Sequence, residues 1–95
     1  MCGRFTLTLT LEDLRRAFPE FDVPVNWEPR YNIAPTQEVP IVPNKGPRQV
    51  TQVRWGLIPF WAKDPSIGNR MINARAETLA EKPSFRAAYR RRRCL

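Results

Sequence analysis

Proline is the residue that most restricts the fold of this chain. The 95 residues contain ten prolines, about twice the usual share of roughly 5%, and only four glycines. Each proline fixes its own φ and lacks a backbone N–H, so it ends helices and is excluded from the middle of a sheet. The prolines are scattered among hydrophobic residues, which make up 42% of the chain. We therefore expect one small domain of short strands joined by stiff, irregular loops.

The N-terminal part of the chain predicts a strand followed by a helix. Residues 2–8 are expected to form a short strand with Phe5 and Leu7 on one face. Thr10 is a suitable N-cap, acidic residues follow it in the first turn, and apolar residues recur at helical spacing until Pro19 ends the segment. Residues 19–29 are expected to form a loop that is anchored by apolar side chains, namely Phe21, Val23 and Val25.

The middle of the chain predicts an extended segment and then a hairpin. Residues 31–36 are expected to be extended, because Pro35 disfavours helix for the residue before it. Val39 and Ile41 alternate as in a strand, residues 44–46 supply a turn, and residues 49–55 return as the second strand. The aromatic stretch that follows is broken by Gly and Pro, which indicates a packed loop.

The last quarter of the chain gives weaker signals. Residues 71–75 resemble a strand that passes into a turn, and Ser84 is a candidate cap for a last short helix. We interpret the run of four arginines at 90–93 as the solvated end of that helix, and Cys94-Leu95 as the start of another strand. No internal repeat and no second domain are evident.

The charge balance favours an anionic partner. Sixteen Lys and Arg against nine Asp and Glu give a net charge of +7, which attracts polyanions such as nucleic acid. No apolar run approaches the roughly 20 residues of a membrane span, so we expect no membrane partner. The first residues lack the apolar core of a signal peptide. We expect an intracellular protein, cytoplasmic or nucleoid-associated if it is bacterial.

The cysteines exclude several kinds of site. Two cysteines and no histidine are too few for a disulfide framework or a zinc site, so we expect no metal and no cofactor. Cys94 is interpreted as an ordinary reduced thiol. Cys2 is different because it follows the initiator methionine. Removal of Met1 would leave a free amine and a thiol on one residue.

A 1,2-aminothiol of this kind reacts with aldehydes. The amine forms an imine, and the neighbouring thiol then closes a five-membered thiazolidine ring in an effectively intramolecular step. The ring-opened sugar of an abasic site in DNA is such an aldehyde. A cysteine at this position is weak support by itself, because most have no special chemistry.

Four motifs in order make the signal specific. They are Met1-Cys2-Gly3-Arg4-Phe5, Arg30-Tyr31-Asn32-Ile33-Ala34-Pro35-Thr36, Trp55-Gly56-Leu57-Ile58-Pro59 with Trp61, and Ile72-Asn73-Ala74-Arg75-Ala76-Glu77-Thr78. Together they resemble the SRAP family, the SOS-response-associated peptidases, over essentially the whole chain. The resemblance implies an α+β fold with a curved, mostly antiparallel, partly barrel-like sheet and short peripheral helices, here truncated.

The resemblance also implies a function and its residues. Cys2 would form a thiazolidine crosslink with an abasic site in single-stranded DNA during the SOS response to DNA damage, and would act as nucleophile in the autoproteolytic removal of Met1. Asn73 resembles the second active-site residue, which hydrogen-bonds around the Cys2 amine and the sugar. Arg4 and Arg75 resemble the arginines that contact DNA phosphates in the family. Four further residues resemble those that line or support its DNA-facing cleft, namely Asn32, Pro35, Trp55 and Trp61.

The chain departs from the family pattern near its end. The family continues with a strand that carries a catalytic glutamate, and later with a histidine, and neither is present in residues 1–95. We therefore expect residues 1–95 to be the N-terminal part of a single SRAP domain whose C-terminal half is absent. Whether this chain is an enzyme stays open, although the family is described as a peptidase.

Three alternatives stay open at this point. The first is an N-terminal-nucleophile cysteine peptidase that acts on peptides. The second is a non-covalent single-stranded nucleic-acid-binding module, and the third is a truncated form without activity. The leading hypothesis has single-stranded DNA with abasic sites as its partner. The replication machinery is a further candidate partner, and we expect the full-length form to be a monomer.

Overall fold

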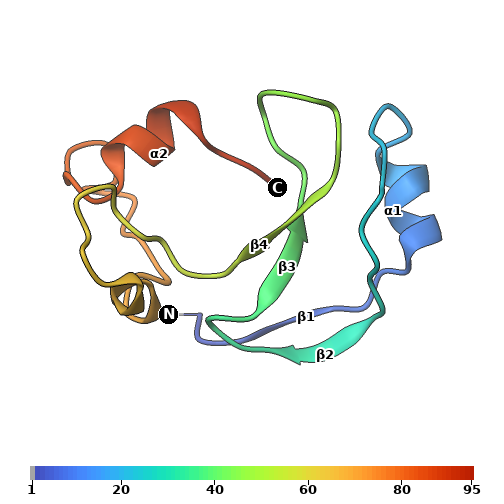
Figure 1. Ribbon diagram of the computed structural model, residues 1–95, viewed down its shortest axis with the longest axis horizontal. Coiled ribbons are helices and arrows are strands. Elements are labelled where there is room, and N and C mark those ends of the chain that lie inside the picture. The colour runs from blue at the N-terminus through green and yellow to red at the C-terminus, as the bar shows by residue number, and fades with distance from the viewer. Residues whose placement is uncertain (1) are drawn as a thin grey trace.

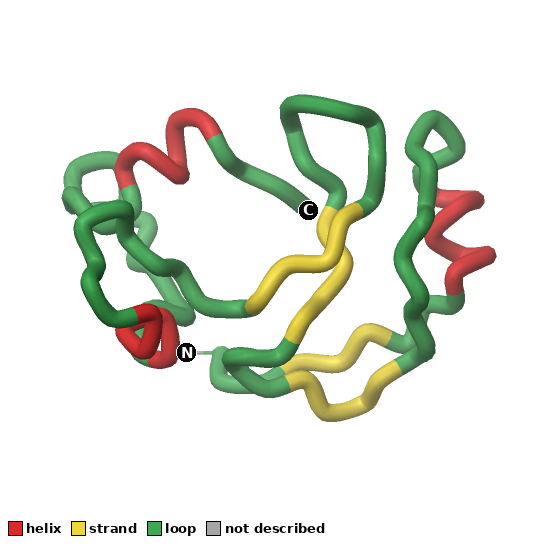
Figure 2. The backbone as a smooth tube through the Cα atoms, viewed as in Figure 1, coloured by secondary structure: helices red, strands yellow, loops and turns green. Residues whose placement is uncertain are grey.

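The computed structural model describes residues 2–95 and arranges them around two short antiparallel strand pairs (Figure 1). The elements in order are β1 (Phe5–Leu7), α1 (Leu11–Ala17), β2 (Arg30–Ile33), β3 (Glu38–Ile41), β4 (Thr51–Arg54), the 3-10 helix η1 (Pro65–Asn69) and α2 (Arg86–Arg91). Figure 2 shows that loops join these short elements over much of the chain, as the prolines predict. The expected α+β class is confirmed, and within the described residues the two sheets are not closed into a barrel.

The first sheet pairs β1 with β2. Phe5 lies opposite Ile33 and Leu7 opposite Arg30, with a register irregularity between the two pairs. Phe5 and Leu7 are half-buried while Thr6 between them is exposed, as the alternation predicted. Ile33, the last residue of β2, is fully buried.

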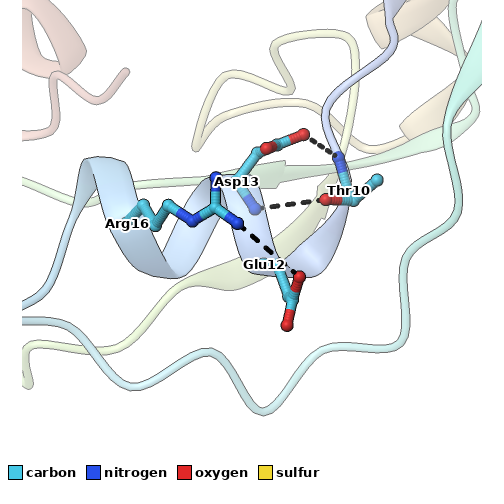
Figure 3. A network of polar contacts seen from close by, with 4 residues as sticks. All are labelled: Thr10, Glu12, Asp13 and Arg16. Atoms are coloured by element: carbon cyan, nitrogen blue, oxygen red, sulfur yellow. Dashed lines mark hydrogen bonds and ion pairs between the residues drawn. The ribbon is translucent and has the colours of Figure 1, made fainter.

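Helix α1 begins where its sequence predicts. The Oγ1 of Thr10 accepts a hydrogen bond from the N–H of Asp13 at 3.2 Å, and the Asp13 carboxylate accepts one from the N–H of Thr10 at 2.9 Å (Figure 3). Hydrogen bonding to the backbone N–H of Thr10, and then to its side chain, holds the pKa of the Asp13 carboxyl below its ordinary 3.8. Glu12 and Arg16, 3.8 Å apart on the exposed face, contribute little because solvent screens them.

The second sheet is the predicted hairpin. Strands β3 and β4 pair in register from Glu38–Arg54 to Ile41–Thr51, and residues 42–50 join them in a loop where Gly46 takes φ of 83°. Val42 and Leu95 exchange backbone hydrogen bonds of 2.9 and 3.0 Å, next to a bridge between Pro43 and Cys94. The last residues therefore add an extended segment beside β3, as predicted from Cys94-Leu95.

The core joins both sheets and α1. Its buried residues are Leu14, Trp27, Ile33 and Val39, and partly buried side chains pack against them, among them Phe5, Leu7, Leu11, Val25, Ile41 and Trp55. Val23 is buried in the 19–29 loop, as expected for an anchor. Trp27 was not among the expected anchors, although its side chain is one of the most buried of the chain.

Two local predictions in the last quarter of the chain are wrong. Residues 71–75 form no strand. Within residues 2–95, the hydrogen bond from the N–H of Leu57 to the carbonyl of Met71 is the only backbone bond that joins this segment to a distant part of the chain. Ser84 does not cap α2, whose N-cap is Phe85 without a side-chain bond. The chain already coils at Lys82, whose carbonyl accepts from the N–H groups of Phe85 and Arg86, so the helix needs no serine to start it.

Candidate functional site

Cys2 and Asn73 are in direct contact although 71 positions separate them. The Nδ2 of Asn73 donates a hydrogen bond of 2.7 Å to the carbonyl of Cys2. Cys2 is exposed, and its thiol donates to the carbonyl of Arg4 at 3.4 Å. The two residues predicted to carry the chemistry therefore share one exposed site.

Arg4 and Asn32 extend the site across the first sheet. The guanidinium of Arg4 donates to Oδ1 of Asn32 at 3.2 Å, and both side chains are exposed. The side chain of Arg4 points to solvent because it precedes the inward-facing Phe5 of β1, and successive side chains along a strand point to opposite faces. The bond to Asn32 leaves other N–H groups of the Arg4 guanidinium free to donate, and a guanidinium beside an exposed cysteine suits a phosphate contact.

Asn73 lies on an irregular segment that is held in place by hydrogen bonds from the end of β4 and the loop after it. The N–H of Leu57 donates to the carbonyl of Met71 at 2.9 Å, and Nε1 of Trp55 donates to the carbonyl of Ile72 at 3.4 Å. Arg75 follows two residues later and is exposed at the start of a turn closed by the N–H of Thr78. Among residues 2–95, no hydrogen bond or ion pair ties the Arg75 guanidinium to the Cys2 site.

Pro35 and Thr36 lie in a tight turn, so the prediction of an extended segment over residues 31–36 is wrong for its last two residues. Thr36 has φ of 78°, a left-handed conformation that is strained for a β-branched residue. The side chain of Gln37 closes the turn, because its Oε1 accepts from the N–H of Ala34 at 3.0 Å and from the guanidinium of Arg30. Gln37 was missed, since nothing in its spacing distinguishes it from a surface residue.

The two tryptophans expected to line the cleft have different surroundings. Trp55 is half-buried and packs edge-to-face on Phe5, with ring centroids 5.1 Å apart. Trp61 is 46% exposed and meets the ring of Phe60, itself 88% exposed, at 5.2 Å. Only Trp61 of this pair presents a substantial open ring, whereas Trp55 belongs to the packing around the core.

The remaining predictions concern metals, membranes and Met1. No three His, Cys, Asp or Glu side chains in the described part of the chain gather closely enough to hold a metal ion. No helix within residues 2–95 has the length and apolar character needed to cross a bilayer. The predicted removal of Met1 concerns a residue outside those that the structure describes.

Known proteins with similar sequences share one kind of name. The chain is 48% identical over 98 residues to the abasic site processing protein YoqW of Bacillus subtilis, a match covering all of this chain and 44% of YoqW. It is 46% identical to YoaM of the same organism, covering 43% of that protein. It is 31% identical to mouse HMCES, also called an abasic site processing protein, covering 34% of it. The chain thus spans less than half the length of these relatives.

A solved structure shares the fold, and a family model matches the whole sequence. A crystal structure of a protein from Bordetella bronchiseptica superposes with a TM-score of 0.67 at 19% identity, over 93% of this chain and 43% of that one. The family model described as SOS response associated peptidase (SRAP) matches residues 1–95. The chain therefore belongs to the SRAP family.

Proposed function

We propose that the protein traps abasic sites in single-stranded DNA through a covalent bond to Cys2. The observation that carries the proposal is the 2.7 Å hydrogen bond between Asn73 and Cys2, which joins the first and last of the four motifs at an exposed site. The names of relatives such as YoqW and HMCES, abasic site processing proteins, point to the same substrate. In this proposal residues 1–95 are the N-terminal part of a single SRAP domain.

The chemistry requires the new amino terminus that loss of Met1 creates. Water hydrolyses the Met1–Cys2 peptide bond, and the freed amine attacks the aldehyde carbon of the ring-opened sugar. Loss of one water gives the imine. The Cys2 sulfur then adds to the imine carbon, and the thiol proton passes to nitrogen, which closes the thiazolidine ring. Amine and sulfur belong to one residue, so ring closure is intramolecular and favoured by proximity.

Neighbouring residues orient this reaction and hold the DNA. Asn73 is an uncharged donor and acceptor that fixes the Cys2 carbonyl, and thereby the direction of the adjacent amine. Arg4 is held by Asn32 and is exposed beside the thiol, where its charge suits a phosphate of the DNA backbone. The net charge of +7 favours the same sequence-independent binding.

An abasic oligonucleotide tests the proposal directly. Purified protein is incubated with single-stranded DNA that carries one abasic site, and the covalent complex is measured on a denaturing gel. We expect Cys2→Ala to abolish the complex and Cys94→Ala, at the other free and exposed thiol, to leave it unchanged. Equal yields from the parent and Cys2→Ala would refute the proposal, and cleavage of unrelated peptides without any DNA complex would favour a peptidase.

The proposal also covers the setting in which the protein works. We infer an intracellular protein, monomeric in its full-length form, that meets single-stranded DNA near the replication machinery or the nucleoid. Sedimentation at micromolar concentration would test the monomer, and recovery of crosslinked protein from stalled replication forks would test the location. A stable dimer, or adducts formed equally in non-replicating cells, would contradict these two points.

A further inference from the structure

Cys2 and Asn73 meet without any shared regular structure. β1, which follows Cys2, pairs only with β2 among the described strands, and Asn73 lies outside every helix and strand. A single hydrogen bond between two exposed residues is too weak to define their geometry, since its net contribution is about 1 kcal/mol. Another group must therefore fix these two segments relative to each other.

Trp55 contacts both segments. Its ring packs edge-to-face on Phe5 of β1, with centroids 5.1 Å apart and an interplanar angle of 71°. Its Nε1 donates to the carbonyl of Ile72 at 3.4 Å, one residue before Asn73. One side chain thus links the strand that begins three residues after Cys2 to the segment that carries Asn73.

The backbone of Trp55 is itself held on both sides. Its N–H donates to the carbonyl of Gln37 at 3.0 Å, and its carbonyl accepts from the N–H of Thr36 at 2.9 Å. These bonds continue the β3–β4 ladder by one residue, so the indole extends from a fixed support. The tryptophan therefore has little freedom to follow either segment if that segment moves.

The two residues after Trp55 reinforce the same connection. Leu57 donates its N–H to the carbonyl of Met71 at 2.9 Å, immediately before the residue that Trp55 holds. Gly56 lies against the backbone of Gly68, where an added Cβ would meet the Gly68 oxygen at 2.4 Å. Residues 55–57 therefore fix Met71 and Ile72 and leave Asn73 as the first residue free to reach Cys2.

From these contacts we propose that Trp55 is a positioning residue that sets the geometry between Cys2 and Asn73, and not a platform on which DNA bases stack. This assignment rests on the proposed function and replaces the DNA-contacting role expected from the sequence for Trp55. The half-buried ring supports it, because the ring already packs against Phe5 and the core. Trp61, 46% exposed, is the tryptophan suited to stacking.

Kinetics with the abasic oligonucleotide separate positioning from binding. Trp55→Phe keeps an aromatic ring against Phe5 but removes the N–H that holds Ile72. We expect its maximal crosslinking rate at saturating DNA to fall about 10–100-fold, the effect of a displacement on the order of 1 Å at a reacting centre. The half-saturating DNA concentration should stay the same. Trp61→Phe serves as the reference for a binding defect and should raise the half-saturating concentration.

A measurement without DNA tests the geometry itself. The side-chain amide signal of Asn73, assigned by its loss in Asn73→Ala, reports the hydrogen bond to Cys2 in ¹⁵N-edited NMR spectra. We expect Trp55→Phe to shift this signal and Trp61→Phe to leave it in place. If Trp55→Phe does not fold, Phe5→Leu removes the aromatic contact from the other side and should produce the same shift.

The outcomes distinguish this inference from the proposed function. An Asn73 signal that is unchanged in Trp55→Phe and Phe5→Leu would overturn the positioning role. A raised half-saturating concentration with an unchanged maximal rate in Trp55→Phe would overturn it in favour of a DNA contact. Absence of any adduct in the parent protein would refute the proposed function alone, because the NMR measurement uses no DNA.

Discussion

Gly56→Ala is the substitution that most sharply tests how the site is held together. Gly56 has φ of 134°, a conformation that side-chain-bearing residues rarely adopt, and an added Cβ would lie 2.4 Å from the carbonyl oxygen of Gly68. Both obstacles are backbone, so no side chain can rotate away. To regain an ordinary contact of 3.4 Å, the two segments must separate by about 1 Å.

The expected cost follows from these two contributions. Backbone strain costs about 1–3 kcal/mol, and overpacking adds about 1–3 kcal/mol. A loss of at least about 2 kcal/mol lowers Tm by at least about 8 °C, given about 4–8 °C per kcal/mol for a domain of 60–100 residues. The displaced segment carries Asn73, whose 2.7 Å bond to Cys2 does not survive a separation of that size.

Thermal unfolding and the crosslinking rate measure both effects. Gly46→Ala is the matched control, because Gly46 also has a left-handed φ of 83° but has nothing within 4 Å of its added Cβ. Backbone strain should lower the stability of the control by only about 1–2 kcal/mol. Its crosslinking rate should equal that of the parent. Equal destabilisation by the two substitutions, or an unchanged rate in Gly56→Ala, would show that the Gly56–Gly68 contact does not position Asn73.

Three further predictions concern single side chains. Asn73→Ala should slow adduct formation about tenfold or more while leaving Tm near that of the parent, because Asn73 is exposed, and an unchanged time course would exclude its assigned role. Arg75→Ala should weaken non-covalent binding of single-stranded DNA evenly across sequences and reduce the salt slope by about 0.7, whereas a loss confined to particular bases would contradict a phosphate contact. Asp13→Asn should remove a stabilisation that is complete above pH 3.8 and is lost as the pH falls through the lowered pKa of the Asp13 carboxyl, so urea unfolding of the two proteins should differ at neutral pH and converge in acid. A constant difference at every pH would show that the carboxylate does not act through its charge.

Local sequence signals predicted the elements that short-range physics determines. Thr10 and the acidic residues after it predicted where α1 begins, and the structure adds the reciprocal bond in which the Asp13 carboxylate accepts from the N–H of Thr10. The turn at Gly46 and the alternation of Val39 and Ile41 predicted the hairpin. Each of these features depends on residues within a few positions of one another, so periodicity and capping preferences were sufficient.

The site depends on contacts that no local pattern contains. Cys2 and Asn73 are 71 positions apart, and their pairing followed only from the resemblance to a family. Trp55 contacts both Phe5 and Ile72, and Gly56 lies against the backbone of Gly68. Both features depend on how the residues after β4 pack. Residues 71–75 were mistaken for a strand, because their apolar start resembles one, although the carbonyls of Met71 and Ile72 accept from Leu57 and Trp55 and the segment pairs with no strand among residues 2–95.

Intact mass spectrometry of the protein, before and after incubation with an abasic oligonucleotide, tests the role of Cys2 most directly. We expect the untreated protein to lack the mass of Met1, and the treated protein to gain the mass of the oligonucleotide less one water. The adduct should form without a reducing agent and should be absent from Cys2→Ala. A protein that keeps Met1 and still forms the adduct, or one that loses Met1 and forms none, would contradict capture of the sugar by the Cys2 amine and thiol.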